Sequence, residues 1–331
     1  MTASIPPFET NADFQDRRTG LIVFGVLLIL LGLLTSLLIP VMIFGYFMSK
    51  QLATASAISF QMLLPSLLMY GALSVAFIWL GAGSIACRRW ARALLLVLSS
   101  IWLATGIEAM AIMACVLPYI LDHPSQKSAA LTGPIQAVVT AIVFGIDGTI
   151  FVIIPLVLFL FYRSKHVKAT CEARDPKVRW TDACPLPVLA LSLLLALGSV
   201  SLPFTMLSHG SVVPMFGFYV SGLPASAVMI LMAIVYGFAA WSCYNLKIQG
   251  WWAGLIALLG TSISFGITIA RIGILPMYEL MKVPQAQIEQ MRAMGFLDTP
   301  FFPLTMFAVF VPYVAFIIFT RRYFKKAEVL Q

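Results

Sequence analysis

The sequence predicts an all-α membrane protein that crosses the bilayer eight times, and three observations lead to this prediction. Hydrophobic residues make up 61% of the 331 residues and charged residues only 10%, whereas a soluble domain carries about a quarter charged residues. The mean hydropathy is +0.97. Eight apolar runs are long enough to cross a bilayer core, which takes roughly 18–20 helical residues, and such unbroken runs do not fit the strands of a barrel.

The eight spans fall into two groups of four, separated by a polar segment at residues 163–185. The tails at residues 1–20 and 321–331 are polar, and residues 21–162 and 186–320 hold the membrane spans. The first run is too long for a signal peptide and lacks a small-residue cleavage pattern. The expected spans are Leu21–Met48, Phe60–Cys87, Ala93–Leu121, Ile135–Tyr162, Leu186–Leu207, Met215–Tyr244, Trp251–Met277 and Pro303–Thr320.

The distribution of lysine and arginine predicts the orientation. With both tails inside, 16 of these residues lie on the cytoplasmic side, 4 lie on the outer side, and Arg271 lies within a span. Basic residues are retained on the cytoplasmic side of membrane proteins, so we expect both termini and the segment 163–185 to be cytoplasmic. The natural setting is a cell membrane, and a bacterial inner membrane is the expected one. The net charge of +8 lies in short loops beside spans, which argues against a nucleic-acid partner.

The two groups of spans resemble one another at a nearly constant offset. Four pairs of residues match at offsets of 157, 158, 159 and 156, namely Pro155 with Pro312, Pro118 with Pro276, Pro65 with Pro224, and Cys87 with Cys243. Chance similarity of apolar helices is the alternative. Because each group has an even number of spans, a duplication would give two parallel four-helix repeats.

Three charged residues lie within the predicted spans: Glu108, Asp147 and Arg271. Charges inside a membrane are costly and face a partner or a pathway. One interpretation is a structural bridge between Arg271 and Glu108, with Asp147 protonated or hydrogen-bonded. The other is a polar cavity between the repeats, open to the outer side, in which these three residues bind a small solute or ion.

The polar segment holds a second candidate site at Arg179, Trp180 and Asp182. A tryptophan flanked by charges suits the lipid headgroup layer, and the plain interpretation is a linker between the repeats. The alternative is a docking surface for a cytosolic protein partner.

No metal, haem or other cofactor is expected. His123, His166 and His209 lie near membrane edges, and the spacing of Cys171 and Cys184 is too weak a signal for zinc. Nucleotide-binding and hydrolase motifs are absent from the sequence.

These observations favour a protein that transports or binds a small solute or ion. The alternative is a non-catalytic scaffold or accessory subunit of a larger complex. A membrane enzyme ranks third, because Glu108 and Asp147 are the only candidate acid–base groups inside the spans.

Overall fold

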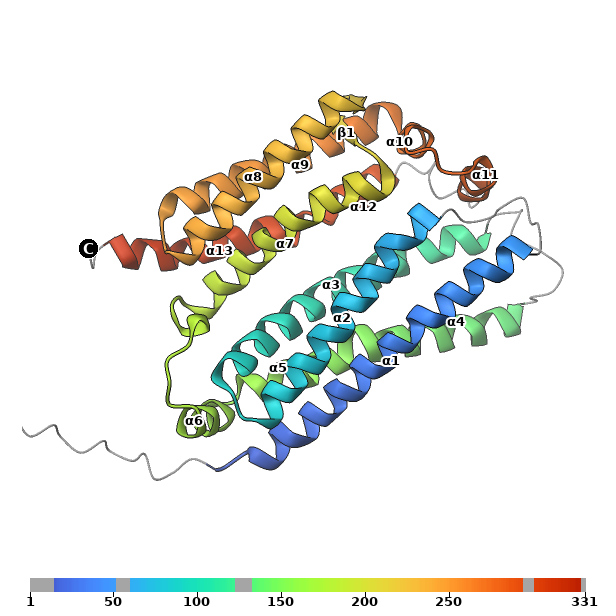
Figure 1. Ribbon diagram of the computed structural model, residues 1–331. Coiled ribbons are helices and arrows are strands. Elements are labelled where there is room, and N and C mark those ends of the chain that lie inside the picture. The colour runs from blue at the N-terminus through green and yellow to red at the C-terminus, as the bar shows by residue number, and fades with distance from the viewer. Residues whose placement is uncertain (1–14, 52–59, 123–132, 294–300, 329–331) are drawn as a thin grey trace, which may run out of the picture.

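The computed structural model describes residues 15–51, 60–122, 133–293 and 301–328, and Figure 1 shows their arrangement. Eight of the described helical stretches are long and apolar enough to cross a membrane, as predicted. They are Arg18–Met48, Leu63–Ile85, Arg89–Leu117, Ala137–Arg163, Leu186–Leu207, Leu223–Tyr244, Ile248–Ile272 and Phe302–Phe324. The chain is therefore a multi-pass helical membrane protein.

The first half comprises residues 18–163. It contains the helices α1 (Arg18–Gln51), α2 (Phe60–Ile85), α3 (Arg89–Asp122), α4 (Gly133–Gly148) and α5 (Ile154–Arg163), and the π-helical turn η2 (Thr149–Ile153) joins α4 to α5. These helices share a core of their own, built from Leu21, Leu28, Phe77, Leu80, Leu95, Leu158 and Tyr162.

The second half comprises residues 186–328. It contains α7 (Leu186–His209), the strands β1 (Val212–Met215) and β2 (Phe218–Ser221), α8 (Leu223–Tyr244), α9 (Ile248–Ile272), α10 (Leu275–Leu280), α11 (Gln285–Ala293), α12 (Phe301–Ala308) and α13 (Val311–Glu328). Its separate core includes Val188, Leu189, Leu191, Ala239, Trp251, Ile317 and Phe324.

The connecting segment, residues 164–185, is folded. Its helix α6 (Lys165–Arg174) buries Val167 and Cys171 in the core of the first half. The short 3₁₀ helix η3 (Trp180–Asp182) follows, and Cys184 then packs in the core of the second half. The segment therefore joins the halves by burying Val167 and Cys171 in the first core and Cys184 in the second.

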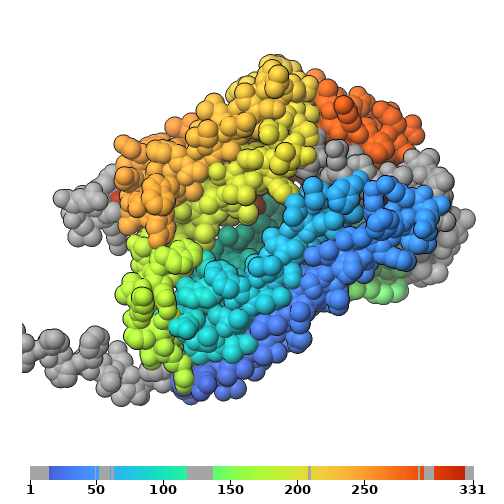
Figure 2. Space-filling model, viewed as in Figure 1, coloured from blue at the N-terminus to red at the C-terminus, as the bar shows by residue number. Residues whose placement is uncertain are grey.

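The two halves lie side by side as separate bundles, the first in blue to green and the second in yellow to red (Figure 1). Helix α7 packs against α2 and α3 and makes the main contact between them. The space-filling view shows a hollow between α7 and α2, with the teal atoms of α3 in its floor (Figure 2). We call this junction the seam.

The starts of α1, α3 and α7, the connecting segment and the end of α13 lie toward one end of the molecule (Figure 1). We call this end the basic face, because Arg88, Arg89 and the basic residues of α6 lie there. The other end, which carries the β-hairpin, is the opposite face.

The sixth span begins later than the sequence predicted. Residues 215–222 are not helical, because β1 and β2 form a hairpin that pairs Met215 with Phe218. Its two turn residues, Phe216 and Gly217, have φ values of 45° and 110°, which suits the tight turns that connect two twisted strands. The helix starts only at Leu223, beyond the φ of 72° at Gly222.

The spans that end the two halves are both interrupted just before a proline. The π-helical turn η2 precedes Pro155, and a turn at Val309 and Phe310 separates α12 from α13 before Pro312. Proline has no N–H, so the carbonyl four residues earlier loses its helical hydrogen bond. In the first half, Gly106 of α3 packs directly against the carbonyl of Phe151 in the π-helical turn.

The turns α2–α3 and α8–α9 have the same backbone geometry. Cys87 and Leu246 occupy the left-handed region at φ 53° and 57°, and each turn is closed by the same two backbone hydrogen bonds. A Cβ built on Gly83 lies 2.6 Å from Ala91 Cβ, and one on Gly250 lies 2.5 Å from Ser242 Cβ. The two turns are 159 residues apart; the internal duplication stays a prediction.

Candidate functional site

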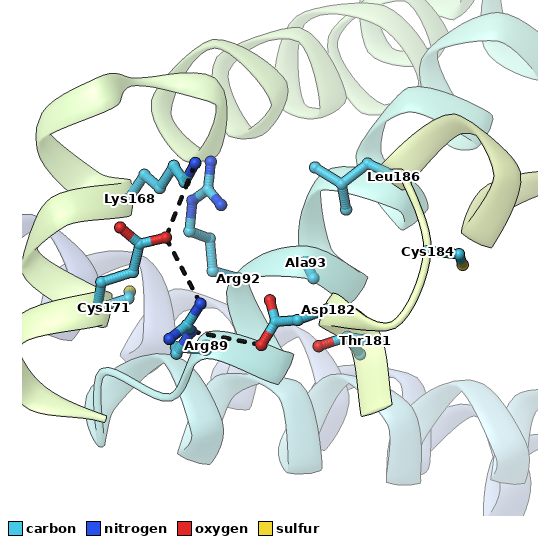
Figure 3. A pocket seen from close by; sticks show the side chains of 10 residues that line it. Arg89, Arg92, Ala93, Lys168, Cys171, Thr181, Asp182, Cys184 and Leu186 are labelled. Carbon is cyan, nitrogen blue, oxygen red and sulfur yellow. Dashed lines mark ion pairs between the residues drawn. The ribbon is translucent and has the colours of Figure 1, made fainter. Parts of the chain in front are cut away.

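A polar cavity of about 290 Å³ opens on the basic face, at the base of the seam. It lies between the start of α3, the helix α6, the 3₁₀ helix η3 and the start of α7 (Figure 3). Its lining combines three cations, two carboxylates and two thiols: Arg89, Arg92, Lys168, Glu172, Asp182, Cys171 and Cys184, together with Ala93, Thr181 and Leu186.

The α2–α3 turn places the arginines at this cavity. Cys87 lies in the turn after α2 and has the left-handed conformation. The tight turn leads through Arg88 to Arg89, the first residue of α3. Arg92 follows one helical turn after Arg88 and Arg89. Burial of Ala91 and Ala93 fixes the rotation of α3 here, so that Arg89 and Arg92 reach the connecting segment.

Two carboxylates of the connecting segment neutralise Arg89. The carboxylate of Glu172 lies 3.7 Å from Arg89 Nη2 and 3.8 Å from Lys168 Nζ. The carboxylate of Asp182 lies 3.4 Å from Arg89 Nε. These pairs draw α6 and η3 onto the start of α3 and form one wall of the cavity, as the dashed lines in Figure 3 show.

Arg92 differs from Arg89. Among the described residues no carboxylate lies within ion-pair distance of Arg92, and its Nε is buried without a hydrogen-bond partner. Arg92 and Lys168 both line the cavity (Figure 3). With three cations and two carboxylates among its lining residues, the cavity carries one uncompensated positive charge, and Arg92 provides it.

Asp175 anchors the connecting segment below this cavity. Its carboxylate accepts a hydrogen bond of 2.9 Å from Arg179 Nη2 and one of 3.3 Å from the backbone N–H of Arg89, and lies 3.7 Å from Arg88. The hydrogen bond from Arg179 holds the pKa of this buried carboxyl below its usual value. The segment between α6 and α7 therefore has a fixed course past the cavity.

The two cysteines of the lining are chemically quiet. Burial raises the pKa of Cys171 to about 12 and that of Cys184 to about 11, and a thiol reacts as its thiolate. Within the described residues no three histidine, cysteine or acidic side chains lie close enough together to hold a metal ion. His123, expected near a membrane edge, lies outside the described residues.

The three charged residues predicted for a shared site lie on separate elements. Glu108 is on α3, Asp147 is on α4, and Arg271 is in the last turn of α9 near the opposite face. None of the ion pairs between described residues joins Glu108 to Arg271. Whether these residues bind a ligand stays a prediction.

Arg271 packs instead on the hairpin. A Cβ on Gly217 would lie 2.8 Å from its Cδ. The hairpin turn is held on α9 by Ser264 and Thr268, whose hydroxyls accept hydrogen bonds of 3.0 Å from the N–H groups of Phe216 and Gly217. The sequence analysis placed Phe216 and Gly217 in the sixth helical span, so it did not predict the contact between Arg271 and the hairpin.

The predicted partner site is divided between inward and outward side chains. Arg179 binds Asp175, and Asp182 pairs with Arg89. Trp180 is 47% exposed and its neighbour Val178 is 70% exposed, while the Trp180 carbonyl accepts a hydrogen bond from Tyr244 of α8. The charged members have structural partners, and the apolar surface remains open.

Sequence reasoning took Arg88, Arg89 and Arg92 as markers of topology and did not identify the cavity. The available signal was the opposite charge of the connecting segment, where Glu172, Asp175 and Asp182 recur near the arginine cluster in the fold but about 85 residues later in the sequence. No protein-family model, curated protein or solved structure matches the chain.

Proposed function

We propose that this protein binds a small anionic solute in the basic-face cavity and carries it across the membrane along the seam. The observation that carries the proposal is Arg92, the cation of the cavity without an ion-pair partner among the described residues. A guanidinium offers several donors in a fixed plane, which suits a carboxylate or a phosphate group.

The size and charge of the cavity support a small ligand with one negative charge at the contact point. Its volume of about 290 Å³ lies at the lower end of ligand pockets, which range over about 300–1,000 Å³. The lining carries one positive charge in excess. A carboxylate or a phosphate ester satisfies both conditions.

Transport is proposed because the cavity lies where the halves meet. Each half has its own core, and modest interfaces within one chain permit relative motion. The similar turns at Cys87 and Leu246 support the internal duplication that forms part of this proposal. By the positive-inside rule the basic face is cytoplasmic, and the proposed setting is a bacterial inner membrane.

Binding is tested with the full chain in detergent. Inorganic phosphate and citrate serve as probes, and a ligand at 100 times its Kd stabilises the folded state by about 2.7 kcal/mol. We expect at least one probe to raise the melting temperature of the wild type and Arg92→Gln to weaken this binding at least tenfold. Arg163→Gln is the control, because Arg163 is an exposed arginine of the same face that does not line the cavity.

Two results contradict the binding proposal: no stabilisation of the wild type by either anion, or equal binding by Arg92→Gln and the wild type. Transport is measured separately, as uptake of the labelled anion into liposomes that contain the protein. Binding without uptake would support the anion site and contradict the proposal that the protein is a carrier.

The scaffold alternative is favoured by the exposed surface of Val178 and Trp180. It predicts a stoichiometric protein partner that co-purifies with the wild type and is lost in Trp180→Ala. Trp252→Ala is the control, since Trp252 is a 45% exposed tryptophan near the start of α9. Trp180 is a cleaner choice than Arg179, whose removal also unpairs Asp175.

A further inference from the structure

Glu108 is a carboxyl group inside the membrane without a described partner. It lies on the span Arg89–Leu117, 19 residues from one end and 9 from the other, or about 28 Å and 14 Å along the helix. Its Oε1 is buried and has no hydrogen-bond partner in the part of the chain that the structure describes. An ionised carboxylate in such a position is expensive.

The described groups around Glu108 do not supply a cation. Tyr313 of α13, in the other half, lies within electrostatic reach of its carboxylate. The described titratable groups on the elements that pack on α3 within the spans are Tyr70 of α2, Asp147 of α4 and, at the basic-face end of α5, Tyr162 and Arg163. The apolar cavity of about 250 Å³ beside Tyr313 has hydroxyl groups but no charged side chain in its lining.

The backbone near Glu108 is fixed by its own half. Two residues before it, Gly106 packs against the Phe151 carbonyl of the π-helical turn η2. This close contact locks α3 to the π-helical turn η2. Tyr313, by contrast, belongs to the second half, so the surroundings of Glu108 change when the halves move relative to one another.

We infer that Glu108 is a proton-binding site at the seam: the carboxyl carries a proton while the two halves are packed as in this structure. Movement of α13, the helix that carries Tyr313, lets water reach the carboxyl and release the proton. A protonated carboxyl donates a hydrogen bond and carries no charge, which removes the cost of an unpaired carboxylate in the bilayer. The inference goes beyond anion binding and does not depend on Arg92.

The test uses the full chain in liposomes at pH 7 and the infrared band of a protonated carboxyl. We expect the band in the wild type and its loss in Glu108→Gln. A free glutamate has a pKa of about 4.3, so an ordinary exposed carboxyl is ionised at pH 7 and gives no such band. Absence of a Glu108-dependent band at pH 7 would overturn the inference.

A pair of substitutions at Tyr313 tests the location. Tyr313→Lys introduces an ammonium group near Glu108, which ionises the carboxyl by providing a counter-ion, so the band should disappear. Tyr313→Phe keeps the ring and adds no charge, so the band should persist. A band that survives Tyr313→Lys in folded protein would place the proton elsewhere. Both results are independent of whether phosphate or citrate binds at Arg92.

Discussion

The hydroxyl groups of Ser84 and Tyr162 lie 2.7 Å apart and join the end of α2 to the end of α5. The Ser84 hydroxyl also donates to the Leu21 carbonyl of α1, so Tyr162 donates to Ser84. Both residues are buried, at 2% and 0% exposure. Three helices of the first half are thus tied together by one short chain of hydrogen bonds.

Tyr162→Phe should lower the free energy of unfolding by about 0.5–1.5 kcal/mol, because it removes one hydrogen bond and keeps the ring. Ser84→Ala should cost about 1–3 kcal/mol, since it leaves the buried Tyr162 hydroxyl without a partner and removes the additional bond to the Leu21 carbonyl. Thermal unfolding in detergent measures both. The double variant should cost less than the sum of the single variants; strict additivity would show that the hydroxyl pair contributes nothing.

Gly106→Ala should destabilise the first half by about 1–3 kcal/mol, as overpacking of a tight contact does. The added methyl group meets the Phe151 carbonyl, which is backbone and cannot rotate away. Gly145→Ala is the matched control, because it is also a glycine within a membrane helix and its Cβ meets nothing within 4 Å. Equal melting temperatures for the two variants would contradict the close contact.

Asp175→Asn should lower the stability of the fold at neutral pH by about 1.5–3 kcal/mol, the range for a hydrogen bond to a charged group. The pKa of Asp175 is lowered in the folded protein by its bond from Arg179. The contribution is therefore present above the unfolded value of about 3.9 and is lost as the pH falls through the folded pKa. Melting temperature against pH measures it; the wild type and the variant should converge in acid.

The eight spans were predictable because hydrophobic length alone determines them. The hairpin was not, because Val212, Val213 and Met215 are as apolar as helix residues, and the turn at Phe216 and Gly217 depends on contacts with Ser264 and Thr268. Pro155 and Pro312 marked similar positions in the two halves, but the prolines did not give the π-helical form of the interruption before Pro155.

The candidate site was less predictable than the spans. Arg92 and Glu172 are 80 residues apart in the sequence, and only the packing of α6 on α3 brings their side chains to one cavity. A bridge between Arg271 and Glu108, one of the two interpretations of these charges, is not among the ion pairs of the described residues. Counting residues along each helix gives the depth of Glu108 and Arg271 in the membrane. It does not give the direction in which their side chains point.

The α2–α3 and α8–α9 turns each have a close contact between their two helices, and the glycine of this contact lies on the first helix in one turn and on the second helix in the other. In the first half Gly83 faces Ala91, and in the second half Ser242 faces Gly250. Either position accepts a side chain only while the other remains small. In related sequences positions 83 and 91 should therefore covary, as should 242 and 250, each pair conserving its combined volume while the individual residues exchange.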